Sequence, residues 1–333
     1  MPVNAAGGVS VVPVTVVATE ELRGGRRLRD WLGDRILLLL TLAAGLAAVV
    51  LIGVIAYKVV RGAHLALSAF GLSFVWGTAW DVNKAVFGAA PGLFGTVVTS
   101  LIALVVATPL ALAIALFLSE LAPRGVRLVV GSLVEMLAAI PSVVLGLWGI
   151  LVLGPFLAGH VEPWLHRTLG FLPIFRGAPQ SSGIFVAGLI LAIMVVPIVA
   201  SVCRELFLSV PSELEEGALA LGATRWEMVR GVVLSSSRPG IAAAVILGLG
   251  RAMGEAIAVT QVIGAGWFIR GDLFGPGDTL ASRIAGQYQG WSSRLQLASL
   301  FYLAVILLVI GLVTNLAAQL IIRRFASVRT GGI

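Results

Sequence analysis

Six long apolar runs constrain the fold of this 333-residue chain more than any other feature. A helix needs about 20 predominantly apolar residues to cross the hydrocarbon core of a bilayer. The runs that meet this length are Ile36–Tyr57, Pro91–Leu118, Leu128–Leu153, Gly183–Val202, Gly240–Ile263 and Leu297–Ile322. Charged residues make up only 12% of the chain, against about 25% in a soluble domain. The sequence therefore predicts an all-α, polytopic membrane protein with six transmembrane helices, and it excludes a soluble globule.

The basic residues predict the orientation of these helices. If the N-terminus is cytoplasmic, 14 of the 23 lysines and arginines fall in inside segments, eight fall outside, and Arg251 lies within a span. Inside segments of membrane proteins carry the excess of positive charge. We therefore expect both termini in the cytoplasm. The net charge of +7 then reflects orientation and does not indicate nucleic-acid binding.

We divide the chain into three parts: a flexible cytoplasmic tail at 1–30, a first transmembrane helix with its extracytoplasmic loop at 31–90, and a transmembrane core at 91–325. The first apolar run is longer than the apolar region of a signal peptide, which spans about 7–15 residues, so it predicts an uncleaved anchor. The expected outside loops are rich in Trp, Phe, Gly and Pro. They fit an interfacial aromatic belt, a docking surface for an extracytoplasmic partner, or both.

The charged segment between the fourth and fifth apolar runs predicts a loop of two short helices. Ser212 is followed three residues later by Glu215, and Thr224 by Glu227. Both spacings are those of a capping box, which satisfies free backbone groups at a helix start. Gly222 lies between them and can adopt the left-handed conformation that ends a helix. We expect this structured loop to hold a partner.

A proline interrupts the third apolar run at Pro141. Proline removes a backbone hydrogen bond and disfavours helix in the residue before it. The segment is therefore either a broken helix that lines a cavity or a kinked helix in which Ser142 satisfies the freed carbonyl.

Two charged residues lie inside the fifth apolar run. Arg251 is near its middle, and Glu255 follows one turn later on the same face. A charge at that depth costs roughly 2.5–3.5 kcal/mol on insertion scales. The pair either joins two helices or faces a polar path through the membrane. A guanidinium can donate two parallel hydrogen bonds to an oxyanion such as phosphate, while Glu255 can hold that guanidinium or accept a bond from a protonated phosphate, which sulfate cannot offer.

Other residues in the apolar runs have less specific interpretations. Glu135 is a second intramembrane acid, which either reaches the membrane surface, pairs with Arg251, or contributes to a transport path. Gly250 and Gly254 are four residues apart and predict close helix packing. Cys203 is the only cysteine, so an intramolecular disulfide or a thiolate metal cluster is excluded, and we expect a packing thiol.

Nucleotide and metal motifs are absent from the sequence. The phosphate-binding pattern G-x-x-x-x-G-K-[ST] does not occur, and the glycines around Arg251 follow no strand, so they are no dinucleotide fingerprint. The three histidines lie in outside loops without ligand spacing. We expect a chain that binds no cofactor and is not an enzyme.

The charged loop resembles the cytoplasmic loop of ABC importer permeases. That loop has the pattern E-A-A, three residues, G, nine residues, and I-x-L-P. The matching positions here are Glu216, Gly217, Ala218, Gly222, Val232, Leu234 and Ser235. Gly217 and Ser235 depart from the pattern, but the turn glycine is present. The resemblance implies that the loop at 204–239 docks an ATPase.

Two further segments, at Leu247–Gly264 and Ala138–Pro155, resemble the permeases of phosphate-specific ABC importers, and the PstC type more than the PstA type. This resemblance implies the type I ABC importer permease fold, with Arg251 and Glu255 acting in phosphate passage. It also implies four kinds of partner: a PstA-type permease, a PstB-type ATPase dimer that binds ATP and Mg, an extracytoplasmic PstS-type phosphate-binding protein, and the lipid of the bacterial cytoplasmic membrane.

We therefore expect the permease subunit of an ATP-driven phosphate importer. An ion-coupled secondary transporter, with Arg251 and Glu255 binding oxyanion and proton, is the main alternative, but it would need no ATPase-docking loop. A permease for molybdate or sulfate is the nearest alternative among ABC importers. A membrane scaffold without transport would leave Arg251 unexplained.

Overall fold

The computed structural model describes residues 21–327. The chain separates into two compact units, residues 1–57 and 58–333. Most of the tail predicted at 1–30 lies outside the described residues, and from Glu21 onward the chain is helical. The α-helices are α1 (Glu21–Phe70), α2 (Ser73–Trp76), α3 (Ala90–Leu116), α4 (Arg124–Ala139), α5 (Ser142–Trp148), α6 (Gly154–Phe156), α7 (Glu162–Leu169), α8 (Ile184–Leu208), α9 (Ser212–Ala220), α10 (Arg225–Met228), α11 (Leu234–Gly254), α12 (Ile257–Val262), α13 (Leu280–Gln287) and α14 (Arg294–Ser327).

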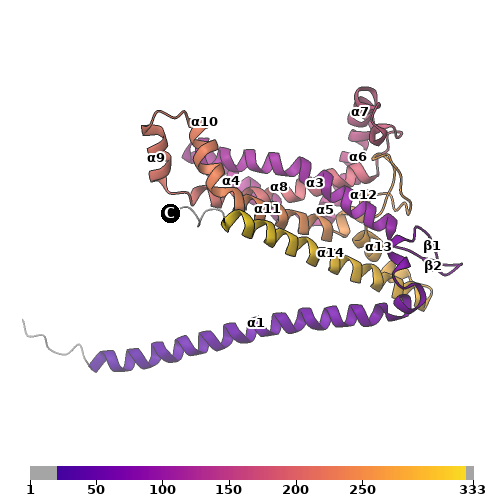
Figure 1. Cartoon of the computed structure of the whole chain (residues 1–333), viewed down its shortest axis with the longest axis horizontal. Helices are drawn as coiled ribbons and strands as arrows, with labels where there is room; N and C mark the ends of the chain where they lie inside the picture. Colours follow the sequence, from indigo (N-terminus) through magenta and orange to yellow (C-terminus); the bar gives the residue numbers. More distant parts are fainter. Residues whose placement is uncertain (1–20, 328–333) are drawn as a thin grey trace, which may run out of the picture. The chain divides into compact units, whose positions relative to one another are not determined.

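Short non-α turns and one small hairpin complete the described chain. The π-helical turns are η1 (Phe117–Leu121), η2 (Gly149–Leu153), η3 (Leu157–Val161) and η5 (Val229–Val233), and the 3₁₀ turns are η4 (Pro173–Phe175) and η6 (Tyr288–Gly290). Strands β1 (Trp80–Asp81) and β2 (Val86–Phe87) pair antiparallel, with Trp80 opposite Phe87. Within the unit that starts at residue 58, α9 and α10 lie at one end of the helix bundle, and α7 and the β1–β2 hairpin lie at the other (Figure 1).

Six helical segments of the described chain are long and apolar enough to cross a membrane, as predicted. They are Gly33–Phe70, Ala90–Leu121, Ser142–Leu169, Ile184–Leu208, Arg225–Gly254 and Arg294–Ala317. The all-α polytopic fold is therefore confirmed. The first segment extends beyond its prediction, because α1 continues through Lys58 and Arg61, which we expected in an outside loop, to Phe70.

The third predicted span is wrong in its position. Helix α4 ends at Ala139, Ile140 is extended with ψ 126°, and α5 begins after Pro141. The chain is therefore broken rather than kinked, because Pro141 lacks the N–H that would continue the helix and keeps Ile140 out of the helical region. The segment able to cross the membrane starts after this break, at Ser142, and absorbs much of the loop expected at 155–182.

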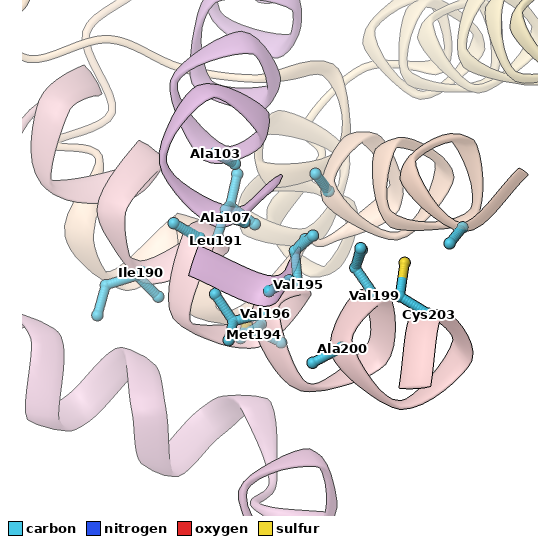
Figure 2. Packing of buried hydrophobic residues seen from close by; sticks show 14 of the residues in the cluster. Ala103, Ala107, Ile190, Leu191, Met194, Val195, Val196, Val199, Ala200 and Cys203 are labelled. Carbon is cyan, nitrogen blue, oxygen red and sulfur yellow. The ribbon is translucent and has the colours of Figure 1, made fainter. Parts of the chain in front are cut away.

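The core of the bundle is the contact between α3 and α8. Ala103, Ala107, Ala111 and Ala115 recur every four residues along α3 and are fully buried. They face apolar side chains of α8, as Figure 2 shows for Ala103 and Ala107 beside Leu191. Small residues at this spacing let two helix backbones approach closely. Helix α8 is accordingly the most enclosed of the six segments, with 72% of its apolar window buried.

Cys203 and the glycines of α11 also lie near this core. Cys203 is free and buried in the α3–α8 cluster, as expected of a packing thiol. The close glycine contact is made by Gly248, where an added Cβ would lie 2.8 Å from Val195. An added Cβ at Gly250 or Gly254 would meet nothing within 4 Å. The prediction of close packing at these two glycines is therefore wrong within the described chain.

A second apolar cluster joins the end of α1 to α14. An added Cβ on Gly62 would lie 2.7 Å from the Phe301 ring, so this helix crossing requires glycine. The rings of Phe74 and Tyr302 stack with centroids 4.4 Å apart, and the Tyr302 hydroxyl donates to the Gly71 carbonyl at 3.0 Å. The residues that follow the first apolar segment are thus fixed to the last helix.

Candidate functional site

A groove of about 580 Å³ lies between α8, α11 and α14. Small or apolar side chains such as Ile198, Ala243 and Leu247 form most of its wall. Four polar residues also line it, one from α11 and three from α14: Arg251, Thr314, Asn315 and Gln319. A concave site with a few polar groups on an apolar wall is typical of small-ligand binding.

Arg251 and Glu255 form an ion pair at the edge of this groove. Their closest atoms, Nη2 and Oε2, are 3.4 Å apart, and the side chains are 50% and 6% exposed. Glu255 thus holds the Arg251 guanidinium, as considered from the sequence. Half of the arginine side chain nevertheless stays open, so its other N–H groups can reach a ligand.

The two residues do not share one continuous helix, contrary to the prediction for 240–263. Helix α11 ends at Gly254, Glu255 is extended with ψ 119°, and α12 starts at Ile257. The second carboxylate oxygen, Oε1, accepts a hydrogen bond from the Ala258 N–H at 3.3 Å, in the first turn of α12. Glu255 therefore holds Arg251 with one oxygen and the next helix with the other.

Glu135 lies apart from this groove. Its carboxylate is 3.8 Å from Nη1 of Arg204 on α8, and the two side chains are 67% and 27% exposed, respectively. The pairing with Arg251 that we considered does not form. The charge of Glu135 is instead balanced at the contact between α4 and α8.

The loop between α8 and α11 has the predicted two-helix form. Gly222 turns the chain with φ +89°, in the left-handed region that favours glycine. Thr224 and Glu227 form a complete capping box, with the Thr224 N–H 2.8 Å from the Glu227 carboxylate. The box predicted at Ser212 is wrong. Pro211 occupies the cap position without a side-chain hydrogen bond, and Ser212 is already inside the helix.

This loop presents apolar side chains to its surroundings. Leu214, Leu219, Leu221 and Trp226 are all exposed. Of the residues that match the permease pattern, Glu216, Gly217 and Gly222 are exposed, while Ala218, Val232 and Leu234 are half-buried. Exposed apolar residues gathered on a polar loop mark an interaction surface.

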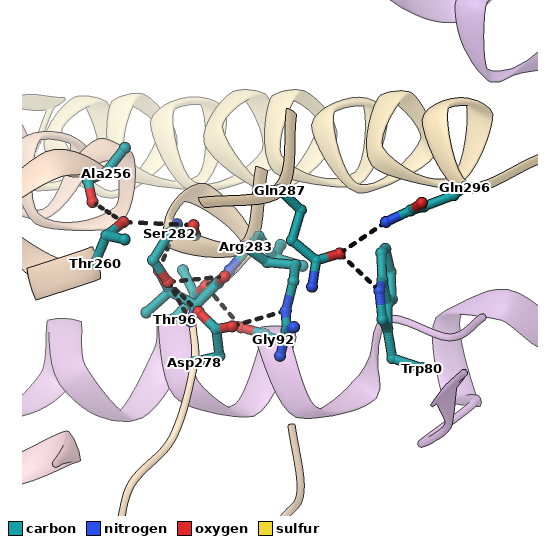
Figure 3. A network of polar contacts seen from close by, with 12 residues as sticks. Trp80, Gly92, Thr96, Ala256, Thr260, Asp278, Ser282, Arg283, Gln287 and Gln296 are labelled. Carbon is teal, nitrogen blue, oxygen red and sulfur yellow. Dashed lines mark hydrogen bonds and ion pairs between the residues drawn. The ribbon is translucent and has the colours of Figure 1, made fainter. Parts of the chain in front are cut away.

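A buried polar network lies toward the other end of the unit, around α13 (Figure 3). Nε of Arg283 is 2.7 Å from Asp278, and both side chains are less than 10% exposed. The guanidinium also lies 4.2 Å from the Trp267 ring and 5.7 Å from the Trp80 ring. Burial raises the pKa of the Asp278 carboxyl and lowers the pKa of the Arg283 guanidinium, whereas the charge of each partner opposes these shifts.

Comparison with known proteins identifies the type of molecule to which this architecture belongs. Residues 107–327 match the family described as "Binding-protein-dependent transport system inner membrane component". The chain belongs to this family of transport permeases. Its membrane location and its multi-pass architecture agree with the six apolar segments.

Relatives of the PstC type align with nearly the whole permease. The phosphate transport system permease protein PstC of Pasteurella multocida is 41% identical over 82% of this chain and 87% of its own length. The PstC protein of Mesorhizobium japonicum is 39% identical over 97% of this chain and 100% of its own. A PstC protein of Mycobacterium tuberculosis is 38% identical over 76% and 82%. The resemblance to the PstC type is thereby confirmed.

Solved structures confirm the permease fold. A chain of a bacterial ABC transporter for import of the acidic polysaccharide alginate superposes with a TM-score of 0.55, at 20% identity, over 87% of this permease and 96% of that chain. A second structure, of a bacterial alginate ABC transporter in complex with an alginate pentasaccharide-bound periplasmic protein, gives a TM-score of 0.53 at 22% identity over 89% of this permease and 95% of that chain. At these identities the likeness shows the fold alone.

The permease thus brings two of the three predicted path residues together. Arg251 and Glu255 meet beside the groove, and Glu135 does not join them. The sequence analysis missed Asn315 and Gln319, which line the same groove. Two amides four residues apart in the last apolar helix were the available signal. It also missed the Asp278–Arg283 pair, whose members lie in an outside loop that we interpreted as an aromatic belt or a docking surface.

Proposed function

We propose that this chain is the transmembrane permease subunit of an ATP-driven phosphate importer. The observation that carries the proposal is Arg251, a half-open guanidinium on a polar groove in a chain similar to PstC proteins along almost its full length. A guanidinium recognises oxyanions through paired N–H donors. In a low-dielectric setting its attraction for an anion is much stronger than in water.

Glu255 keeps this charge in place without neutralising it fully. Its Oε2 faces Arg251 across 3.4 Å, and the arginine side chain stays 50% exposed. An incoming phosphate therefore meets a positioned guanidinium whose charge is partly balanced. The partial balance favours release as well as binding, because a bare buried arginine would hold a dianion too tightly to pass it on.

The groove requires partners to become a transport path. Three of its polar residues, Arg251, Asn315 and Gln319, are exposed on the surface of this chain. We therefore propose that a second, PstA-type permease covers the groove and completes it. A PstB-type ATPase dimer, holding ATP and Mg, would dock on the apolar side chains of the loop at 204–239, and a PstS-type protein would deliver phosphate from the opposite side. In this arrangement both termini and the loop lie in the bacterial cytoplasm. The chain then consists of a tail at 1–30, a first helix with its extracytoplasmic loop at 31–90, and a transmembrane core at 91–325. The permease itself then binds no cofactor.

The direct test is phosphate uptake by the complete transporter in reconstituted vesicles. Unmodified complex should import phosphate when supplied with ATP and should ignore an imposed proton gradient. Arg251→Gln should lower uptake about tenfold or more, because a hydrogen-bonded charge contact contributes about 1.5–3 kcal/mol. Uptake driven by the proton gradient alone would instead establish a secondary transporter.

A double variant separates a path residue from a structural ion pair. If Arg251 and Glu255 only join two segments, Arg251→Gln combined with Glu255→Gln removes both charges and should restore transport. If they handle phosphate, the double variant should stay as impaired as Arg251→Gln. Full recovery, normalised to assembled complex, would contradict the path assignment.

The coupling loop has its own test at Gly222. A side chain at φ +89° strains the backbone by roughly 1–2 kcal/mol, so Gly222→Val should displace α9 from α10 and reduce ATP-driven uptake. Gly231→Ala is the matched control, because an added Cβ there meets nothing within 4 Å and the residue has no positive φ. Normal uptake by Gly222→Val would contradict ATPase docking on this turn.

A further inference from the structure

Two amide side chains on α14 line the groove that contains Arg251. Asn315 and Gln319 are both exposed, and their spacing of four residues places them on one helix face. Within the part of the chain that the structure describes, neither amide has a hydrogen-bond partner. Thr314, their neighbour in the groove, differs, because its hydroxyl donates to the Ile310 carbonyl at 2.8 Å.

Two amides without a partner among the described residues need an explanation at this position. Asn315 lies inside the segment 294–317 that is apolar enough to cross a membrane, and Gln319 follows two residues later. Leaving an amide without a partner in hydrocarbon costs roughly 2–7 kcal/mol. The two side chains therefore require water or a polar ligand in the groove, or polar groups of another subunit.

The polar residues are spread along the length of the groove, as expected for a path along which a ligand moves. After the break at Glu255 the chain enters α12, which packs on α13, and α13 in turn packs on α14. Figure 1 shows that α11 runs from the α10 end of the bundle toward α12, whereas α14 runs from α13 back toward the α10 end, so the two helices are antiparallel. The groove is lined by Ala243 to Arg251 on α11 and by Gly311 to Gln319 on α14, so the Arg251 end of the first row faces the Gly311 end of the second. Eight residues of α14 separate Gly311 from Gln319, a rise of about 12 Å. The amides thus extend the row of polar groove residues from Arg251 toward the start of α11. This end of α11 is the one connected to α9 and α10 of the coupling loop.

We propose that Asn315 and Gln319 bind the anion after Arg251 and select for an oxyanion that still carries a proton. This inference rests on the proposed function. Each amide NH₂ can donate to an anion oxygen, and each amide carbonyl can accept a hydrogen bond from a P–OH group. Sulfate, fully ionised at neutral pH, has no proton to give and would leave both carbonyls unpaired. The amides add no charge, so they guide the anion without trapping it.

The test compares groove variants in the complete transporter, reconstituted with its partner subunits and supplied with ATP. Asn315→Leu and Gln319→Leu should each lower phosphate uptake per assembled complex about tenfold, since each removes a hydrogen bond to a charged ligand. Thr41→Val is the control, because Thr41 lies on α1 outside the groove and its hydroxyl already donates to the Leu37 carbonyl of its own helix at 2.8 Å. It should stay within about twofold of the unmodified complex, the effect of a surface change.

A third variant tests selectivity. Gln319→Lys keeps donors on a flexible side chain, removes the carbonyl acceptor and adds a positive charge. Sulfate, which should not inhibit phosphate uptake by the unmodified complex, should become an inhibitor in this variant. Unchanged insensitivity to sulfate would overturn the selectivity role.

The remaining outcomes are also decisive. Unmodified rates in both leucine variants would overturn the proposal. Poor assembly with normal uptake per assembled complex would assign the amides to contact with the second permease, and would overturn it as well. If the unmodified complex imports no phosphate, the proposed function fails too. That failure is distinguishable, because it appears before any variant is compared.

Discussion

Two of the arginine–carboxylate pairs in the described part of this permease differ in how deeply they are buried. In the Asp278–Arg283 pair the atoms are 2.7 Å apart and both side chains are less than 10% exposed. In the Arg251–Glu255 pair the separation is 3.4 Å, the carboxylate is buried, and half of the arginine is open. The first arginine is enclosed by Trp80 and Trp267, whereas the second borders a groove of about 580 Å³.

This difference indicates which pair stabilises the fold and which pair is available to bind a ligand. In the closed pair the guanidinium is enclosed, so even its Nη2, which has no hydrogen-bond partner among the described residues, is out of a ligand's reach. This pair joins the segments that carry it. Here the network around Arg283 connects the β1–β2 hairpin, α13 and α14 through Trp80, Gln287 and Gln296. A half-open pair stabilises little but keeps a positioned charge available. Variants of the two pairs should therefore separate stability from transport.

The largest effect is expected at the closed pair. Asp278→Asn leaves Arg283 buried without a counter-charge, which should lower the free energy of unfolding by about 3–5 kcal/mol. Thermal unfolding of the purified complex measures this loss. Lys84→Ala is the control, because Lys84 pairs with Asp81 at 3.9 Å on the surface and should change stability by less than about 1 kcal/mol. Equal effects of the two variants would remove the distinction between closed and exposed pairs.

The half-open pair should show the opposite profile. Glu255→Gln leaves an arginine that solvent can reach, so we expect unfolding to change by about 1 kcal/mol or less while phosphate uptake falls clearly. Thermal unfolding and uptake should be measured on the same preparation. A large loss of stability with unchanged uptake per assembled complex would make this pair a structural one like Asp278–Arg283.

The smallest effect is expected at a third pair, Glu135 with Arg204. Their separation of 3.8 Å and the exposure of Glu135 predict that Glu135→Gln changes stability by less than about 1 kcal/mol. Because Glu135 does not line the groove, uptake should also stay within about twofold, as for a surface change. A tenfold loss of uptake would instead support the transport role considered from the sequence.

Local signals in the sequence predicted much of this molecule. The length of the apolar runs gave the six crossing segments, because hydrophobic length is a property of each segment alone. The Thr224 capping box and the Gly222 turn were likewise predictable, since their partners lie within three residues or depend on one φ angle. The Ser212 box failed because Pro211 already occupies the cap position.

The features that the sequence did not reveal depend on contacts between distant segments. The apolar run resumes directly after Glu255 and continues to Ile263, so its length gives no sign that α11 stops at Gly254. The sequence suggested Arg251 as a partner for Glu135, and only the packing of α4 on α8 pairs it with Arg204 instead. Arg283 meets Trp80, about 200 residues earlier in the chain, and no periodic pattern predicts such an encounter.

The alanine row of α3 has a mechanical consequence for the coupling loop. It fixes α8, and the loop leaves α8 at Leu208 and returns to the bundle as α11, which ends in an unwound residue. One end of the loop is thus attached to the buried α3–α8 contact, and the other end leads into α11, whose helix stops at Gly254. We expect a force that a bound partner exerts on the loop to turn α11 against α8. This rotation would move Arg251 along the part of the groove wall that α8 and α14 form.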